Sequence, residues 1–283
     1  MEPRGFISPV AADVESRIPN PESLRYSRSM RGLASSMAEW LRARVHDAGA
    51  RGIVLGLSGG IDSAVVARVA QMAFPDGVMT VIMPADSDPQ DAADAQLVAE
   101  TFDLPVMTID LARPLEALLV QTQQAIGTWP PGSAPDDEKL AKMAQANLKP
   151  RLRMTTLYYV ANRLNYIVAG TGNRTEIAIG YYTKYGDGGV DVLPLGSLVK
   201  SVVRALAREL GVPARVIEKP PSAGLWAGQT DEGELGFTYA ELEEYLLQGP
   251  DAVTPATVMR IERLVRASEH KRQLPPVFEV EGR

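Results

Sequence analysis

The sequence lacks cysteine altogether and contains only two histidines among its 283 residues. The absence of cysteine excludes disulfides, thiolate metal sites and cysteine nucleophiles, and it gives no sign of an oxidising compartment. Two histidines without any cysteine also leave little material for the nucleophile–base pairs that hydrolases use. We therefore expect neither thiol chemistry nor triad hydrolysis from this chain.

The sequence also lacks an excess of positive charge and a long apolar run. Its 29 Lys and Arg residues stand against 35 Asp and Glu residues, a formal net charge of −6, whereas a nucleic-acid-binding protein is usually basic. No apolar run approaches the roughly 20 residues of a membrane span, and the N-terminal residues lack the apolar core of a signal peptide. We therefore expect no nucleic-acid partner, no membrane association and a cytoplasmic location.

What the sequence does contain is a regular alternation of short apolar segments with helical spacing. Each apolar segment is followed by apolar residues at intervals of three and four. The segments are residues 52–57, 77–85, 104–111 and 165–172. This alternation predicts an α/β fold with a doubly wound, mostly parallel sheet and helices on both faces, Rossmann-like in arrangement.

The pattern also predicts the longer helices and the loops. We expect a long helix over residues 140–164, broken or kinked at Pro150, and one further helix over residues 254–273. Residues 183–198 and 218–236 are rich in glycine and polar residues and are expected to form loops. We expect the chain to consist of an extended or disordered N-terminal arm, residues 1–29, followed by a single domain, residues 30–283.

The segment LSGGIDS, residues 57–63, separates the first predicted strand from the helix that follows it. Glycines let a backbone approach a ligand closely, and the N-terminus of a helix favours an anion. The segment is neither a Walker A motif nor a dinucleotide-binding Gly-x-Gly-x-x-Gly motif, yet it carries serines on both sides and Asp62 at the helix start. It predicts a phosphate-binding loop, and a carboxylate beside phosphates fits a magnesium ion.

A second cluster of polar residues follows the last predicted strand, within residues 170–201. Hydroxyl, carboxylate and ammonium groups gather there, and they belong to Thr171, Glu176, Lys184, Asp187, Asp191 and Lys200. Glu176 could join Asp62 on Mg²⁺, which takes a few carboxylates together with phosphate oxygens and water. Lys184 and Lys200 could offset negative charge that develops on phosphate.

These motifs carry a resemblance to a known family. SGGIDS is similar to the pyrophosphate-binding loop of the N-type ATP pyrophosphatases, and GYYTKYGDGGVDVLPLGSLVKS closely resembles the ammonia-dependent NAD synthetases of that class. NLKPRLRMTTLYYVAN, EKPPSAGLWAGQTDEGELGFTY and EHKRQLPP resemble further segments of the same enzymes, in the same order. Together the similar segments extend from about residue 33 to residue 278.

The resemblance implies a role for individual residues. It implies ATP contacts by Gly56, Leu57, Ser58, Gly59, Gly60, Ile61, Asp62, Ser63, Thr171, Lys200 and Ser222. It implies contacts to the second substrate, deamido-NAD, by Arg151, Lys184, Asp191, His270 and Lys271. It further implies catalytic roles for Asp62, Lys200 and Asp191, with Asp62 and Glu176 as ligands of a Mg²⁺ cofactor.

The reaction implied by the resemblance is the amidation of deamido-NAD. Its carboxylate would attack the α-phosphorus of ATP, giving an adenylate and pyrophosphate, and ammonia would then displace AMP. Glutamine-dependent members obtain ammonia from a glutaminase domain that uses a cysteine nucleophile. Because this chain has no cysteine, we expect ammonia to come from solution or from a separate ammonia-supplying protein. The family also implies a homodimer.

Two alternatives remain open at the level of sequence. One is another adenylate-forming, amidotransferase-type synthetase of the ATP pyrophosphatase class, although sulfur-carrying members would usually show cysteines and tRNA-modifying members a basic face. The other is a non-catalytic nucleotide sensor on the same fold. Asp62, Glu176 and the two lysines argue against a sensor, because binding alone does not require them.

Overall fold

The computed structural model describes residues 29–128, 137–221 and 231–278. Apart from residue 29, the predicted N-terminal arm lies outside these residues, and so does Ser222.

A four-stranded, fully parallel sheet lies at the centre of the fold. Its strands, in chain order, are β1 (Ile53–Gly56), β2 (Val78–Ile82), β3 (Val106–Thr108) and β4 (Ile167–Val168). They stand side by side in the order β3-β2-β1-β4. The predicted α/β class with a parallel sheet is therefore confirmed. Each strand is shorter than its apolar segment, because the last residues of each segment already belong to the loops that follow.

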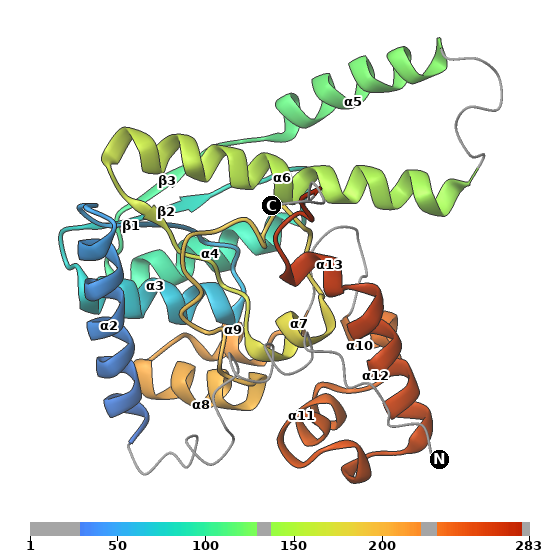
Figure 1. Ribbon diagram of the computed structural model, residues 1–283. Helices are drawn as coiled ribbons and strands as arrows, with labels where there is room; N and C mark the ends of the chain where they lie inside the picture. Colours follow the sequence, from blue (N-terminus) through green and yellow to red (C-terminus); the bar gives the residue numbers. More distant parts are fainter. Residues whose placement is uncertain (1–28, 129–136, 222–230, 279–283) are drawn as a thin grey trace.

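Helices cover both faces of the sheet (Figure 1). In the described part of the chain they are α2 (Met30–Asp47), α3 (Ile61–Ala73), α4 (Pro89–Phe102), α5 (Ala112–Gly127), α6 (Glu138–Leu164), α7 (Arg174–Ile179), α8 (Lys200–Leu210), α9 (Ala214–Glu218), α10 (Asp231–Leu235), α11 (Tyr239–Gln248), the 3-10 turn η2 (Pro250–Ala252), α12 (Pro255–Ala267) and α13 (Glu269–Arg272). None of them combines the length and the apolar character that a membrane span requires.

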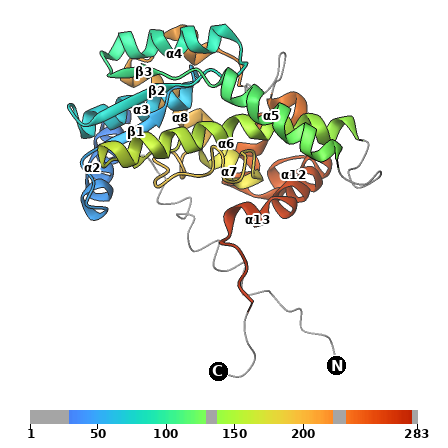
Figure 2. The same ribbon diagram turned by 90° about the horizontal axis from the view of Figure 1, so that it is seen from above.

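Side chains that alternate along the strands divide the core into two layers. Ile53 and Leu55 of β1 pack with α2, α3, α4 and α8 on one face of the sheet. Val54 packs with α5 and α6 on the other, and seen from above α6 crosses the body beside the strands (Figure 2). A smaller apolar cluster around Leu242 and Ile261 joins α7 to α10, α11 and α12. This cluster places the C-terminal helices beside the carboxyl ends of the strands.

Three details differ from the pattern read in the sequence. α6 runs through Pro150 without interruption, so the predicted break is absent; the loop at Gly186 packs against this buried proline. α10 lies inside the predicted loop 218–236. The predicted helix 254–273 is divided at Ser268, whose hydroxyl donates to the carbonyl of Leu264.

The connections define where a ligand can bind. From β1 the chain continues through β2 to β3 on one side, and then crosses to β4 on the other side of β1. In parallel α/β sheets, ligands bind beyond the carboxyl ends of the strands at the point where the winding direction changes. The loops that follow β1 and β4 meet at this point, and they carry both motifs singled out in the sequence.

Candidate active site

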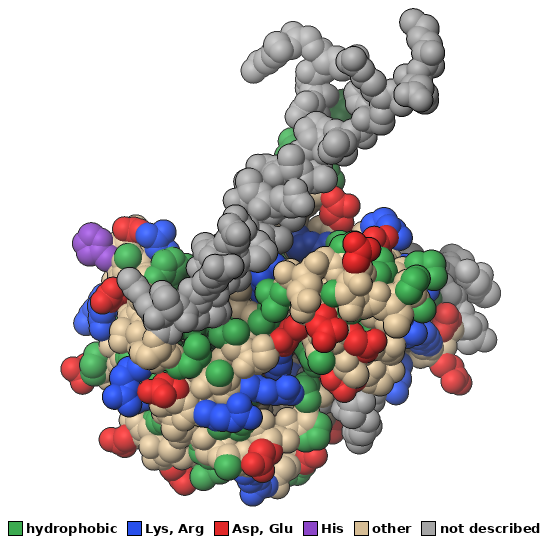
Figure 3. Space-filling model, turned by 90° about the horizontal axis from the view of Figure 1, so that it is seen from below, with side chains coloured by type: hydrophobic (Ala, Val, Ile, Leu, Met, Phe, Trp, Pro, Cys, Tyr) green, Lys and Arg blue, Asp and Glu red, His purple; other side chains and the backbone are tan. Residues whose placement is uncertain are grey.

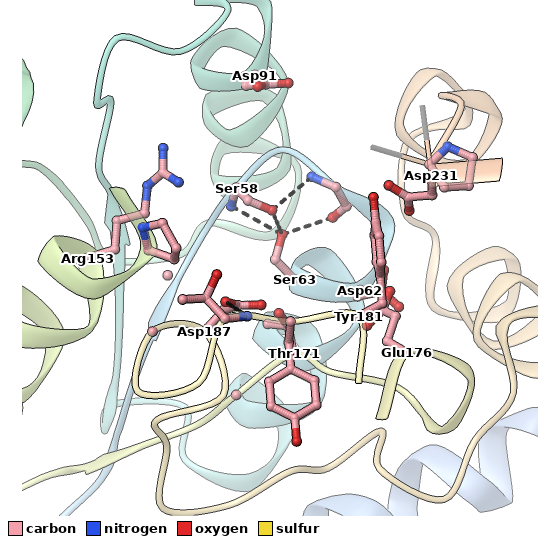
Figure 4. A pocket seen from close by; sticks show the side chains of 18 of the residues that line it. Ser58, Asp62, Ser63, Asp91, Arg153, Thr171, Glu176, Tyr181, Asp187 and Asp231 are labelled. Carbon is pink, nitrogen blue, oxygen red and sulfur yellow. Dashed lines mark hydrogen bonds between the residues drawn. The ribbon is translucent and has the colours of Figure 1, made fainter. Parts of the chain in front are cut away.

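The loop between β1 and α3 is held in shape by its two serines. The amide of Ser58 donates to the hydroxyl of Ser63 at 3.2 Å, and the two hydroxyls lie 3.1 Å apart. The Ser63 hydroxyl also donates to the carbonyl of Gly60 at 2.9 Å, and the Gly60 amide donates to the hydroxyl of Ser58 at 3.3 Å. Figure 4 shows these bonds closing a tight turn at the start of α3. The serines therefore fix the loop before any ligand arrives.

Gly59 is required by both backbone conformation and space. Its φ of +79° lies in the left-handed region, which residues other than glycine rarely adopt. A Cβ atom at this position would lie 2.3 Å from the carbonyl oxygen of Asp91 on α4. The loop is thus pressed against the first turn of α4, and no larger residue fits.

The first turn of α3 presents amide donors to the loop. Its N-cap is Gly60, which has no side chain, and no side chain caps the helix there. The first amides of a helix have no intrahelical partner, and with the helix dipole they favour an anion. A phosphate group is the partner that fits such a turn.

Two carboxylates and one ammonium group meet beside this turn. Nζ of Lys200, the first residue of α8, lies 2.5 Å from Oδ2 of Asp62 and 3.3 Å from Oε1 of Glu176. The Lys200 side chain is only 4% exposed, and it also lies over the ring of Tyr239, 5.6 Å from the centroid. Three helices, α3, α7 and α8, therefore direct their first turns at one buried point.

Asn173 orders this cluster. Its amide nitrogen donates to Oδ1 of Asp62 at 3.0 Å, while its side-chain oxygen caps α7 by accepting from the amide of Glu176. The Glu176 carboxylate accepts in return from the backbone amide of Asn173 at 3.1 Å. This capping box fixes the direction of both carboxylates.

The cluster shifts the pKa values of its members. Burial raises the pKa of Glu176 to about 7, and the nearby charge of Asp62 adds to the rise. Burial alone would lower the pKa of Lys200, but the charges of Asp62 and Glu176 outweigh it and the net shift is upward. Lys200 therefore stays charged, and the two carboxylates repel each other unless a cation lies between them.

A cleft of about 960 Å³ opens above the loop and the cluster. The described residues that line it include most of the predicted ATP contacts, namely Gly56, Leu57, Ser58, Gly60, Ile61, Asp62, Ser63, Thr171 and Lys200. Gly59 packs against α4 behind the loop. The structure therefore brings the predicted ATP residues together at one wall of the cleft.

The residues predicted for the second substrate are more dispersed. Lys271 lines the cleft, and its ammonium donates to the carbonyls of Gly180 and Tyr182. Arg151, Lys184 and His270 lie near one another outside the cleft lining, where the Lys184 ammonium donates to the carbonyl of His270 at 2.5 Å.

Asp191 also lies outside the cleft lining. Its carboxylate accepts from the hydroxyl of Tyr158 at 2.9 Å and from the backbone amide of Val168 at 2.7 Å. These bonds extend the hydrogen bonding of β4 and hold the loop after it. A contact of Asp191 with a substrate stays a prediction.

Some cleft residues were not assigned a role from the sequence. Arg153, Asp187, Lys219 and Asp231 line the cleft, while Asn173 and Tyr239 contact Asp62 and Lys200 beside it. Asn173 could have been found, because an Asn three residues before a Glu at a helix start is a capping signal. Lys219 carries no such local signal, since its partners lie on a distant helix.

Residues 56–60 read Gly-Leu-Ser-Gly-Gly and so also match the Gly-x-Ser-x-Gly turn of serine hydrolases. The structure argues against that role, because Ser58 has no histidine beside it. His46 is 91% exposed on α2, and His270 lies on the exposed surface of α13. The serine hydroxyl is instead part of the loop's own hydrogen bonding.

A parallel sheet with an anion-binding turn at its switch point, flanked by carboxylates and a buried lysine, defines a nucleotide-binding α/β protein. The sequence model of one family within that class, NAD synthase, matches residues 33–275. The chain belongs to this family, which confirms the family expected from the sequence.

Individual relatives agree with this assignment. The chain is 48% identical to the NH(3)-dependent NAD(+) synthetase of Carboxydothermus hydrogenoformans, over 85% of this chain and 94% of the relative. Among solved structures, an NMN synthetase from Francisella tularensis superposes with a TM-score of 0.81 and 37% identity, over 90% of this chain and all of the other. An NAD+ synthetase from Burkholderia pseudomallei superposes with a TM-score of 0.73 and 30% identity, over 94% and 96%.

Proposed function

We propose that the cleft catalyses the ATP-dependent amidation of deamido-NAD with ammonia, giving NAD, AMP and pyrophosphate. One observation supports this proposal above the others: Asp62, Glu176 and Lys200 converge beside a preformed anion-binding turn. The family assignment supports the same reaction.

The main task of the site is to bring one anion onto another. The amides of α3's first turn would hold the phosphates of ATP, because they belong to residues that line the cleft and no side chain caps the helix. Lys200 would stabilise the charge that develops when the substrate carboxylate attacks the α-phosphorus. The burial of Lys200 strengthens this effect, since water does not screen it.

Mg²⁺ fits the donors that are present. Asp62 and Glu176 already share one cation, the ammonium of Lys200. Among the described residues, no group of three or more His, Cys, Asp or Glu side chains is arranged to hold a metal ion. Magnesium commonly uses one or two carboxylates together with substrate phosphates. We propose that Asp62 and Glu176 hold Mg²⁺ only with ATP, where it would neutralise phosphate charge.

The source of ammonia follows from composition. A chain without cysteine supplies no thiol nucleophile for glutamine hydrolysis. We propose that ammonia enters from solution or from a separate protein.

The cytoplasmic location expected from the sequence is also part of the proposed function. On the face seen in Figure 3, basic and acidic side chains are interspersed and form no large basic surface.

The family also suggests a homodimer, and the structure offers a surface for it. α5 and the first half of α6 project from the body as a hairpin (Figure 1), and Leu115 is the one residue of α5 that is buried. The exposed apolar side chains of this hairpin are Leu118, Val120, Ile126, Leu140 and Met143. We propose that a second copy covers this surface.

A second candidate substrate is the mononucleotide. The printed name of the Francisella tularensis relative, NMN synthetase, points to it. Nicotinic acid mononucleotide carries the same carboxylate, so the chemistry at Asp62 and Lys200 would be unchanged. It lacks the adenylate half that would extend beyond the cleft toward Arg151 and Lys184.

The proposed function is tested by a direct assay. The protein is incubated with ATP, Mg²⁺, ammonium and either deamido-NAD or the mononucleotide, and nucleotides are resolved by chromatography. AMP, pyrophosphate and NAD in equal amounts support the proposal. ADP and phosphate as products, or preferred amidation of the mononucleotide, would contradict it.

A further inference from the structure

Lys219 is a further lysine of the cleft, and the reaction described above assigns it no role. It follows α9 and lines the cleft. Its ammonium donates to Oδ1 of Asp91 and to Oδ2 of Asp94, both at 2.7 Å. The charges of these two α4 residues hold the lysine against the wall of the cleft.

Both partners of Lys219 stand directly behind the phosphate-binding turn. A Cβ atom at Gly59 would lie 2.3 Å from the carbonyl oxygen of Asp91 and 3.0 Å from Cβ of Asp94. The ammonium of Lys219 is therefore separated from the turn by the length of one aspartate side chain. In Figure 4, Asp91 and Glu176 lie on opposite sides of the bonds that join Ser58 to Ser63. Lys219 thus supplies positive charge on the side of the turn opposite to Lys200.

The ion pairs of Lys219 can be exchanged without leaving a buried charge alone. Asp94 is 2% exposed, but it also pairs with Arg215 at 2.9 Å and accepts from Gln90 at 2.9 Å. Asp91 is 30% exposed and can turn toward water. If Lys219 moved to another anion, Asp94 would keep two partners and Asp91 would be solvated.

We propose that Lys219 binds the outer phosphates of ATP and the pyrophosphate that leaves, exchanging part of its contact with Asp91 and Asp94 for phosphate oxygens. This inference rests on the proposed function, since it needs a triphosphate on the turn. It gives the two lysines separate tasks: Lys200 acts where the carboxylate attacks, and Lys219 acts on the leaving group. Stabilising the charge of a leaving group lowers the barrier to its departure.

The same contacts would be seen if Lys219 only tied α9 to α4. Arg215 provides the matched control, because it pairs with the same Asp94 from α9, but it is 58% exposed and is not among the residues that line the cleft. A purely structural role predicts similar consequences for both residues. A phosphate-binding role predicts an effect of Lys219 on phosphate ligands that Arg215 does not share.

The experiment measures binding of magnesium pyrophosphate by calorimetry on the full chain, together with the KM for each substrate. Lys219→Met should weaken pyrophosphate binding and raise the KM for ATP by roughly tenfold to a hundredfold, the range of hydrogen bonds to charged groups. The KM for deamido-NAD should stay within about twofold of the original, and Lys219→Arg should recover much of the loss. Arg215→Met should bind pyrophosphate as the original chain does.

Equal pyrophosphate binding by Lys219→Met and the original chain would overturn the inference, and so would an equal loss in Arg215→Met. If Lys219→Met does not fold, NMR of dimethylated lysines in the original chain replaces it, with the Lys219 signal assigned through Lys219→Arg. That signal should shift on adding pyrophosphate, and an unmoved signal would overturn the inference. Failure of the original chain to bind or release pyrophosphate would instead refute the proposed function.

Discussion

The two regions expected to bind the substrates, the ATP wall at the turn after β1 and the deamido-NAD wall around Arg151 and Lys184, differ in how firmly their charged side chains are held. At the turn after β1, Lys200 is buried, Asp62 and Glu176 are mostly shielded from solvent, and all three have fixed partners. Around Arg151 and Lys184, the cations lie at the surface and contact backbone carbonyls, at 3.4 Å and 2.5 Å. The ATP side is preorganised within one chain, whereas the side expected to hold deamido-NAD offers few fixed partners.

This difference is informative about the proposed dimer. The few fixed partners on the deamido-NAD side fit a binding site that a second copy of the chain completes. The hairpin of α5 and α6, which carries exposed apolar side chains, offers a surface for that copy (Figure 2). Preorganised charges stabilise a transition state strongly, because little rearrangement is needed. Surface contacts contribute mainly to affinity. Substitutions on the two walls should therefore differ in kind as well as in size.

The largest effect is expected at the ATP wall. Asp62→Asn should lower turnover by on the order of a thousandfold, because removing a preorganised charge that acts on the reacting phosphates costs this much. The fold should persist, since asparagine can keep the hydrogen bond with Asn173 and the start of α3. Pyrophosphate release under saturating substrates measures turnover, and circular dichroism checks the fold. Release at the original rate would remove Asp62 from the mechanism.

The turn itself is the next most sensitive feature. Gly59→Ala should destabilise the protein by about 2–4 kcal/mol, from the left-handed backbone and the clash with Asp91. Gly211→Ala is the control, because Gly211 has a φ of +80° and no atom within 4 Å of its Cβ position. It should show the backbone cost alone, about 1 kcal/mol. Equal denaturation midpoints for the two variants would show that α4 does not press on the turn.

The deamido-NAD wall should respond in KM. Arg151→Met should raise the KM for deamido-NAD by roughly tenfold with little change in kcat, as loss of uniform binding predicts. Amidation of the mononucleotide should be unaffected, because it lacks the half that would reach Arg151. Arg163→Met, at an exposed position of the same helix, serves as the control. A fall in kcat with unchanged KM would place Arg151 in the chemistry instead.

The same contrast explains what the sequence could predict. The turn at residues 57–63 depends on local features, glycines and a helix start, so its role was readable from the sequence alone. The pairing of Asp62 with Lys200 crosses 138 residues; the sequence suggested that both act on phosphate, but no local pattern predicted their direct contact. The contacts of Lys219 with Asp91 and Asp94 cross 128 and 125 residues and carry no pattern. Pro150 alone suggested a break or a kink, but α6 continues through it without a break, and the loop at Gly186 packs against the proline.

A buried ion pair and an exposed one should differ in how their contribution to stability responds to pH. Burial alone would raise the pKa of Asp94, but Lys219, Gln90 and Arg215 more than offset it and hold that pKa below its usual 3.8. A lowered pKa means that the ionised carboxylate stabilises the fold above about pH 4, and that this stabilisation is lost as pH falls through the folded-state pKa. Asp94→Asn should therefore cost about 2 kcal/mol at pH 7.

The difference in unfolding free energy between Asp94→Asn and the original chain should be constant from about pH 5 to pH 7 and shrink below about pH 4. Glu262→Gln, which removes the exposed partner of Arg266, should cost only a few tenths of a kcal/mol throughout. Urea denaturation at several pH values measures both. If this difference in unfolding free energy for Asp94→Asn stays unchanged at low pH, the contribution of Asp94 is packing rather than charge. The charge of Asp94 would then not be what holds Lys219 beside the turn.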